Sequence, residues 1–174
     1  YGSTNNLVIG STSASALASG AQFNVFIGEG AGSDSGNSTS ATDQNTALSY
    51  NALTALTSGS GNVAMGEGSM EGNTSGSSNT AIGWDSLNDN IICDNNTAIG
   101  TDALIRNTAS NNTGVGFGAA FTNVAKTGIT AIGFQAMRYA NNDGTAADVR
   151  NTAVGFSALR GSTTVAANTG INNT

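Results

Sequence analysis

The feature that most constrains this chain is a nine-residue phrase that recurs from one end to the other. It reads N-T-A-I-G-W-D-S-L from Asn79 and N-T-A-I-G-T-D-A-L from Asn96. A fixed period of this kind indicates a stacked repeat architecture. The glycine of the phrase is used below as the marker of each repeat, and it lies at Gly10, Gly28, Gly66, Gly83, Gly100, Gly116, Gly133 and Gly155, with Ser49 in its place once.

The spacing of the markers selects the kind of repeat. Successive markers are 18, 21, 17, 17, 17, 16, 17 and 22 residues apart. About 17 residues are too few for a helical-hairpin repeat or a propeller blade, and they fit one coil of a β-solenoid. We therefore predict an all-β fold, a parallel β-solenoid of about nine coils that occupies residues 1–174 as a single repeat domain. Stacking at about 4.8 Å per coil makes a rod of about 43 Å.

Two stretches interrupt the period and are expected to be inserted loops. They lie near 33–44 and 139–150, and both are rich in the polar residues typical of loops. Binding, if any, is expected to use these loops. The repeats run to both ends of the chain, so we expect it to be a segment of a longer array.

The residue before each marker predicts the core. This position is apolar in every repeat, and the residue two places earlier shares its face of a strand, since side chains alternate. That earlier residue is Thr in most repeats and Leu or Val in others, which favours partial burial. The predicted core column is Ile9, Ile27, Leu48, Met65, Ile82, Ile99, Val115, Ile132 and Val154.

The residue between these two columns is small, and it predicts an oligomer. It is Ala in most repeats and carries no charge in any of them, although a solvent-facing column of a half-exposed sheet normally does. We expect this opposite face to be covered by a neighbouring chain, because a coil of 17 residues is expected to be too short to cover its own back.

An asparagine four residues before the marker predicts a structural ladder. Stacked coils place these amides in register, where they can hydrogen-bond from coil to coil. Ile129 interrupts the series. The predicted ladder is Asn6, Asn24, Asn45, Asn62, Asn79, Asn96, Asn112 and Asn151.

Composition and charge limit the function classes. The chain has no proline, only 9 % charged residues and a net charge of -6. All five basic residues follow position 105, so the first part carries -9 and the rest +3, a distribution that favours head-to-tail contact between rods. A basic patch with interleaved aromatics is missing, which argues against nucleic-acid binding. No apolar run is long enough to suggest membrane insertion. Cys93, the single cysteine, is expected to pack as a small buried hydrophobe.

The A-I-G phrase, followed by a small residue and Leu, resembles the head repeats of YadA-like trimeric autotransporter adhesins. It is also similar to the N-T-A-I-G arrays of phage tail-fibre-like proteins. The resemblance covers nearly the whole chain and is closest over 79–104 and 151–159. It implies a left-handed parallel β-roll, three chains side by side, and a place on an extracellular fibre at a cell or virion surface.

No pattern in the sequence predicts an enzyme, a metal site or a cofactor site. The chain has no histidine, so the usual general base and commonest metal ligand are missing. The glycine runs at 28–32 and 114–118 do not open a helix in a βαβ unit, as a nucleotide site requires. The aspartates at 85, 89, 94 and 102 lack the spacing of calcium-binding β-rolls. Glu67 and Glu71 are four apart, which says nothing about whether their carboxyls face each other.

Several N-x-S/T sequons would be glycosylation sites in a chain secreted by a glycosylating cell. The candidates are Asn37, Asn73, Asn95, Asn111 and Asn172.

The sequence thus predicts a non-enzymatic structural fibre or stalk segment, extracellular, whose main partner is itself and which presents adhesive elements. The alternative is a ligand-binding solenoid, either an adhesin for surface glycans or an ice-binding protein. Ice binding needs a flat outward array of Thr, whereas the Thr column is expected to face inward.

Overall fold

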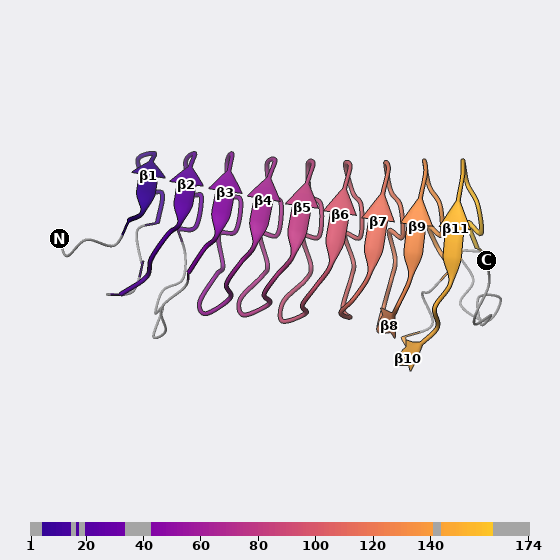
Figure 1. Ribbon diagram of the computed structural model, residues 1–174. Helices are drawn as coiled ribbons and strands as arrows, with labels where there is room; N and C mark the ends of the chain where they lie inside the picture. The colour runs from indigo at the N-terminus through magenta and orange to yellow at the C-terminus, as the bar shows by residue number, and fades with distance from the viewer. Residues whose placement is uncertain (1–4, 15–16, 18–19, 34–42, 141–143, 162–174) are drawn as a thin grey trace.

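A computed structural model describes residues 5–14, 17, 20–33, 43–140 and 144–161. All regular structure within these ranges is β, and the main sheet has nine strands in the order β1-β2-β3-β4-β5-β6-β7-β9-β11. Every neighbouring pair is parallel, so the chain coils once between strands and the strands lie in a row along the rod (Figure 1). The predicted parallel β-solenoid is confirmed. The strands are β1 Leu7–Ile9, β2 Val25–Ile27, β3 Thr46–Leu48, β4 Val63–Met65, β5 Thr80–Ile82, β6 Thr97–Ile99, β7 Thr113–Val115, β9 Thr130–Ile132 and β11 Thr152–Val154.

The register follows the repeat without a slip. Thr80 pairs with Thr97, Ala81 with Ala98 and Ile82 with Ile99, and the other pairs match in the same way. Equivalent residues therefore form columns parallel to the rod. A residue type that recurs at one position of the phrase therefore forms a continuous strip along the rod.

The marker glycine allows each coil to turn sharply after its strand. Gly83 has φ +133°, and a Cβ there would lie 2.6 Å from the carbonyl carbon of Gly100 in the next coil. Ser49 occupies the same place with φ +124°, where a side chain is strained. The second and fourth residues after the marker also have left-handed φ, as at Asp85 and Leu87. The turn thus swings the fourth residue back over the strand.

The core is formed by the small column, and the predicted core column is wrong for the single chain. Ala81 and Ala98 are 0 % exposed, whereas Ile82 and Ile99 are 37 % and 38 % exposed. The Thr column shares the outer face with Ile and is half-buried. The prediction that another chain covers the Ala column is also wrong.

The chain's own return segment covers the Ala column. In the six coils from β3 to β9, the fourth residue after the marker is buried and belongs to the same core cluster as the alanines. This segment has its own coil-to-coil hydrogen bonds, such as Leu87 N to Ala103 O at 3.0 Å. The two walls lie so close that only small side chains fit on the strand. The buried residues of the return wall are Leu53, Met70, Leu87, Leu104, Ala120 and Met137.

The second coil shows the same constraint with the sizes exchanged. Phe26 takes the place of Ala in β2 and is buried, while Gly32 stands where most other coils have Leu or Met. A Cβ on Gly32 would lie 2.9 Å from the Phe26 ring. The total volume of the side chains inside this coil is conserved, because the large side chain lies on the strand wall and the small residue on the return wall.

The insertion near 139–150 is partly structured. β10 (Ala147–Asp148) pairs in parallel with β8 (Lys126–Thr127), forming a second, two-stranded sheet below the main one (Figure 1). Lys126 is buried at this corner, and its Nζ donates to the carbonyl oxygen of Thr145. Most of the other predicted loop, 34–42, lies outside the described residues.

Candidate functional site

The outer face of the nine-stranded sheet is the largest candidate site. Its two columns are the half-buried Thr column and the apolar column that ends each strand, and we call them together the outer face. No side-chain hydrogen bond is recorded for the outer-face threonines of the described coils. The exposed members of the apolar column are Ile9, Leu48, Ile82, Ile99, Ile132 and Val154.

Aromatic side chains border the outer face at the corner after the marker in five of the nine coils. Phe117 and Phe134 stack with ring centroids 5.3 Å apart and an interplanar angle of 15°. Phe134 and Phe156 stack at 5.0 Å and 8°. Tyr50 and Trp84 occupy the same position in other coils and are exposed. The three stacked rings form an aromatic ladder that widens the apolar surface beside β7, β9 and β11, and soluble single chains rarely expose large apolar patches. The four other coils have a polar residue at this position: Ser11, Glu29, Glu67 and Thr101.

The asparagine ladder is present in the structure. Asn96 N donates to Asn79 Oδ1 at 2.8 Å, and Asn79 N donates to Asn62 Oδ1 at 3.0 Å. The Asn79 amide nitrogen also donates to Cys93 O at 2.8 Å. The ladder runs without interruption from Asn6 to Asn112 and there meets Ile129, whose backbone N donates to Asn112 Oδ1. These asparagines are structural groups that fix the coil spacing. The remaining links are Asn24 to Asn6, Asn45 to Asn24, Asn62 to Asn45 and Asn112 to Asn96.

A second buried asparagine column was missed by sequence reasoning. Its members, Asn73, Asn90, Asn107 and Asn123, lie seven residues after the marker and are 0 % exposed. They bond the inner carbonyls of the far corner, as Asn90 Nδ2 does to Cys93 O at 3.0 Å. The asparagine at this fixed distance was visible in the sequence.

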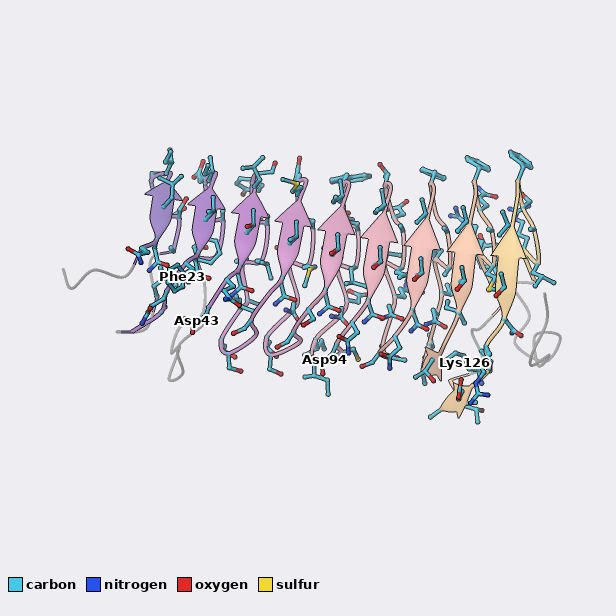
Figure 2. The ribbon with its side chains drawn as sticks, viewed as in Figure 1. Phe23, Asp43, Asp94 and Lys126 are labelled. Atoms are coloured by element: carbon cyan, nitrogen blue, oxygen red, sulfur yellow. The ribbon has the colours of Figure 1, made fainter. Side chains whose placement is uncertain are left out.

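A third polar ladder lines the outside of the corner before the asparagines. Backbone nitrogens donate to side-chain oxygens of the next coil, as Ser77 N does to Asp94 Oδ1 at 2.7 Å and Gln22 N to Asp43 Oδ1 at 2.7 Å. Asp43 and Asp94 lie along this lower corner of the coils in Figure 2. Asp94 is therefore engaged in the scaffold.

The candidate glycosylation sites separate by exposure. Asn73 is buried and bonded to Gly76, so the structure contradicts it as an acceptor in the folded chain. Asn95 and Asn111 are exposed at the corner before the strands. Asn37 and Asn172 lie outside the described residues.

The acidic residues form a patch without a metal-binding arrangement. Among the residues that the structure describes, no group of three His, Cys, Asp or Glu is placed to hold a metal ion. Burial raises the pKa of Asp85, and the nearby charge of Asp102 raises it further, against a hydrogen bond from Asn88 that lowers it. Glu71 and Glu67 add to the same repulsion.

Cys93 is buried, as predicted, beside an apolar corner. Ile91 and Ile92 project from this corner and are exposed, where neighbouring coils have Thr and Ser. Burial raises the pKa of the Cys93 thiol, with the Asp94 charge acting in the same direction. The thiol is therefore held in its protonated, less reactive form.

Comparison with protein-family models, curated proteins and solved structures finds no match for this chain. In the part of the chain that the structure describes, no helix is long and apolar enough to cross a bilayer.

Proposed function

We propose that this chain is a structural fibre or stalk segment, extracellular and non-enzymatic, whose outer face binds further copies of itself. The observation that carries the proposal is the apolar column of Ile, Leu, Val and Met over a single in-register sheet. Six of its nine side chains leave a third or more of their surface to solvent in the single chain, and the other three are half-buried. Packing copies together along this column buries it, at about 25 cal/mol for each Å² of apolar surface removed from water.

The interior supports a structural role. The space between the strand wall and the return wall is filled by Ala, Leu and Asn side chains, several of them fully buried. Coil-to-coil hydrogen bonds run along both walls. This arrangement makes a stiff rod that holds attached elements at a distance from a surface. The resemblance to adhesin head repeats favours three chains around an axis.

The test is the molar mass of a double variant of the outer face. In about 500 mM salt, where contacts between exposed charges are screened, we expect the native chain to form an oligomer and Ile82→Ser with Ile99→Ser to run near the 17.2 kDa of one chain, with unchanged circular dichroism. The matched control is Ile91→Ser with Ile92→Ser, which removes two exposed isoleucines at another corner and should leave the oligomer intact. A single-chain mass for the native protein would refute the proposal.

Ice binding is a second candidate, because the Thr column faces outward and not inward as the sequence predicted. The Thr residues of β5 and β6 lie side by side at equivalent positions, which is the flat array that ice binding needs. Thermal hysteresis that is lost in Thr80→Val with Thr97→Val would support it. The large apolar column beside the Thr column favours the self-contact.

A glycan adhesin is the other ligand-binding candidate. The exposed aromatic ladder offers a stacking surface for sugar rings. Binding of the isolated rod to a glycan array, lost in Phe134→Ala, would support this candidate.

A further inference from the structure

A second outward surface lies on the return side of the coils. The second and fifth residues after each marker point outward there, and we call this surface the turn face. Its members contact one another within a coil and between coils. Asn88 Nδ2 donates to Asp85 Oδ1 of the same coil at 3.2 Å and to Glu71 Oε2 of the preceding coil at 3.4 Å. The fifth-residue column is Glu71, Asn88, Ile105, Phe121, Arg138 and Arg160.

One end of the turn face is acidic and uncompensated. Glu71, Asp85 and Asp102 lie in the coils of β4, β5 and β6, and the pKa of Asp85 is raised by burial and by the charges around it. The one ion pair recorded among the described residues joins Arg150 and Asp148, which belong to the corner of β10. The acidic end therefore lacks a cation within the described chain.

The other end of the turn face is basic and equally uncompensated. The Arg138 guanidinium lies over the Phe121 ring, 4.5 Å from its centroid, and its Nε donates to Tyr139 Oη. Its Nη1 is buried without a hydrogen-bond partner. Arg160 is exposed and lies over Tyr139 at 5.8 Å. No carboxylate pairs with either arginine in the described ranges.

The middle of the turn face is apolar. Ile105 and Phe121 occupy the fifth position in the coils of β6 and β7 and are half-buried. The order along the rod is thus acidic, apolar, basic. An apolar centre with a charged rim is the usual anatomy of a protein–protein interface.

The spacing makes this surface complementary to itself. In the strand order, β4 and β11, β5 and β9, and β6 and β7 lie at equal distances from a point between β6 and β7. A two-fold axis through that point, lying in the plane of the contact and perpendicular to the rod, brings Glu71 against Arg160 of a second copy. It also brings Asn88, with Asp85 beside it, against Arg138, and Ile105 against Phe121. The charged ends lie about 24 Å apart, five strand spacings of about 4.8 Å.

We propose that the turn face binds a second copy of this chain lying antiparallel, through a two-fold contact. A two-fold contact uses the same patch on both copies, so each charged pair occurs twice. A parallel arrangement in register would place Glu71 against Glu71 and Arg160 against Arg160, which like-charge repulsion disfavours. The contact would link rods that run in opposite directions.

This inference does not rest on the proposed function. The turn face and the outer face lie on opposite walls of the coil, and their contacts differ in salt dependence. Exposed charge pairs weaken as ionic strength rises, because the Debye length falls from about 30 Å at 0.01 M to about 3 Å at 1 M. An apolar contact through the outer face does not weaken in this way.

The first test is sedimentation velocity of the chain 1–174 in low and high salt. It is run on the native chain and on the Ile82→Ser, Ile99→Ser background, where contact through the outer face is removed. We expect the double variant to associate in about 20 mM salt and to become a single chain by about 500 mM. The native chain should lose the same salt-dependent association and keep the oligomer that the outer face forms. Salt-independent sedimentation in both backgrounds would overturn the inference and leave the proposed function standing.

Charge reversal then identifies the face. Glu71→Arg alone and Arg160→Glu alone should each weaken low-salt association by about tenfold or more, since both symmetric pairs become repulsive. An equimolar mixture of the two variants should associate again, because each supplies the charges that the other needs. Arg150→Glu is the matched control and should have no effect, although it changes the net charge by the same amount. Failure of the mixture to associate would contradict the contact.

Cross-linking tests the direction. In a Cys93→Ser background, Glu71→Cys and Arg160→Cys chains should form a disulfide dimer when mixed, and neither should do so alone. A disulfide dimer from Glu71→Cys alone would show a parallel contact and refute the proposed arrangement. Unchanged thermal melting of each variant shows that it remains folded.

Discussion

Both faces of each strand carry uncharged side chains, but the inner face is enclosed and the outer face is open to solvent in the single chain. The inner face has Ala, enclosed between two hydrogen-bonded walls of one coil, and the outer face has Thr and Ile, open in the single chain. The larger side chains lie outside because the interior of a 17-residue coil is too thin for them. Size, more than hydrophobicity, therefore decides which face is the core of this solenoid.

The largest expected effect comes from enlarging the inner face. Ala98→Leu forces a branched side chain between two walls that leave no room, and we expect the free energy of unfolding to fall by about 3 kcal/mol. Ile99→Ala, at the next residue on the outer face, should cost about 1 kcal/mol or less in single chains. Guanidinium unfolding at a concentration where the chain is monomeric measures both. A larger loss for Ile99→Ala would reverse the assignment of the faces.

Removing one link of the asparagine ladder should have the next largest effect. Asn79→Ala leaves the buried Asn96 backbone N–H without its partner. It also removes one of the two hydrogen bonds to the Cys93 carbonyl, which keeps the bond from Asn90. We expect a loss of about 2 kcal/mol, the cost of unsatisfied buried groups. Ser75→Ala, an exposed position of the same region, serves as the control and should change the midpoint little. Equal midpoints for the two variants would show that the ladder does not stabilise the coil.

Replacing the one serine at a marker position should stabilise the rod. Ser49 has φ +124°, a conformation that glycine adopts without strain. Ser49→Gly should raise the free energy of unfolding by about 1 kcal/mol. Ser58→Gly, at an exposed position without left-handed φ, should lower it slightly, because glycine makes the unfolded chain more flexible. If Ser49→Gly destabilised the rod, the left-handed φ at position 49 would not be a source of backbone strain.

The smallest effect concerns the pH dependence of Asp85. Folding raises its pKa above the ordinary 3.8, so the folded state holds the proton more tightly than the unfolded chain. Its contribution to stability therefore falls as the pH rises from about 3.8 through the raised pKa, and it recovers on acidification. Asn tolerates a left-handed φ as Asp does, so Asp85→Asn should not strain the backbone. It should raise Tm by about 1 °C at pH 7 and leave Tm unchanged at pH 3. A lower Tm at pH 7 would contradict the repulsion within the acidic patch.

The sequence was sufficient for the fold and insufficient for the choice of core. A 17-residue period, a marker glycine and an asparagine four residues before it predicted the parallel solenoid and the Asn6–Asn112 ladder. Alternation in the strand separated Ala81 from Ile82 but could not tell which faced inward, because hydrophobicity favoured Ile and the width of the coil was unknown. The left-handed φ of the second residue after the marker has a signature, since that residue is Gly, Asn or Asp in six coils, but the left-handed φ of Leu87 itself leaves none.

The sequence predicted which residues form each column of the candidate site, but not which face of the coil the column occupies. The apolar column that ends each strand was identified correctly as a set, and its position on the outside follows from the return wall that the sequence did not reveal. The column Asn73 to Asn123 was overlooked because its asparagines are not part of the nine-residue phrase. The acidic and basic ends were noted as charges along the chain, and only the coil geometry places them on one face.

Cryo-EM of the assembled chain would show where each column of the coil lies. We expect several chains in contact, with the Ile82, Ile99 and Ile132 column buried between copies and the Ala column enclosed inside each coil. A map that shows single rods with the Ile column in solvent, or the Ala column at a contact between chains, would refute both the self-contact and the assignment of the core.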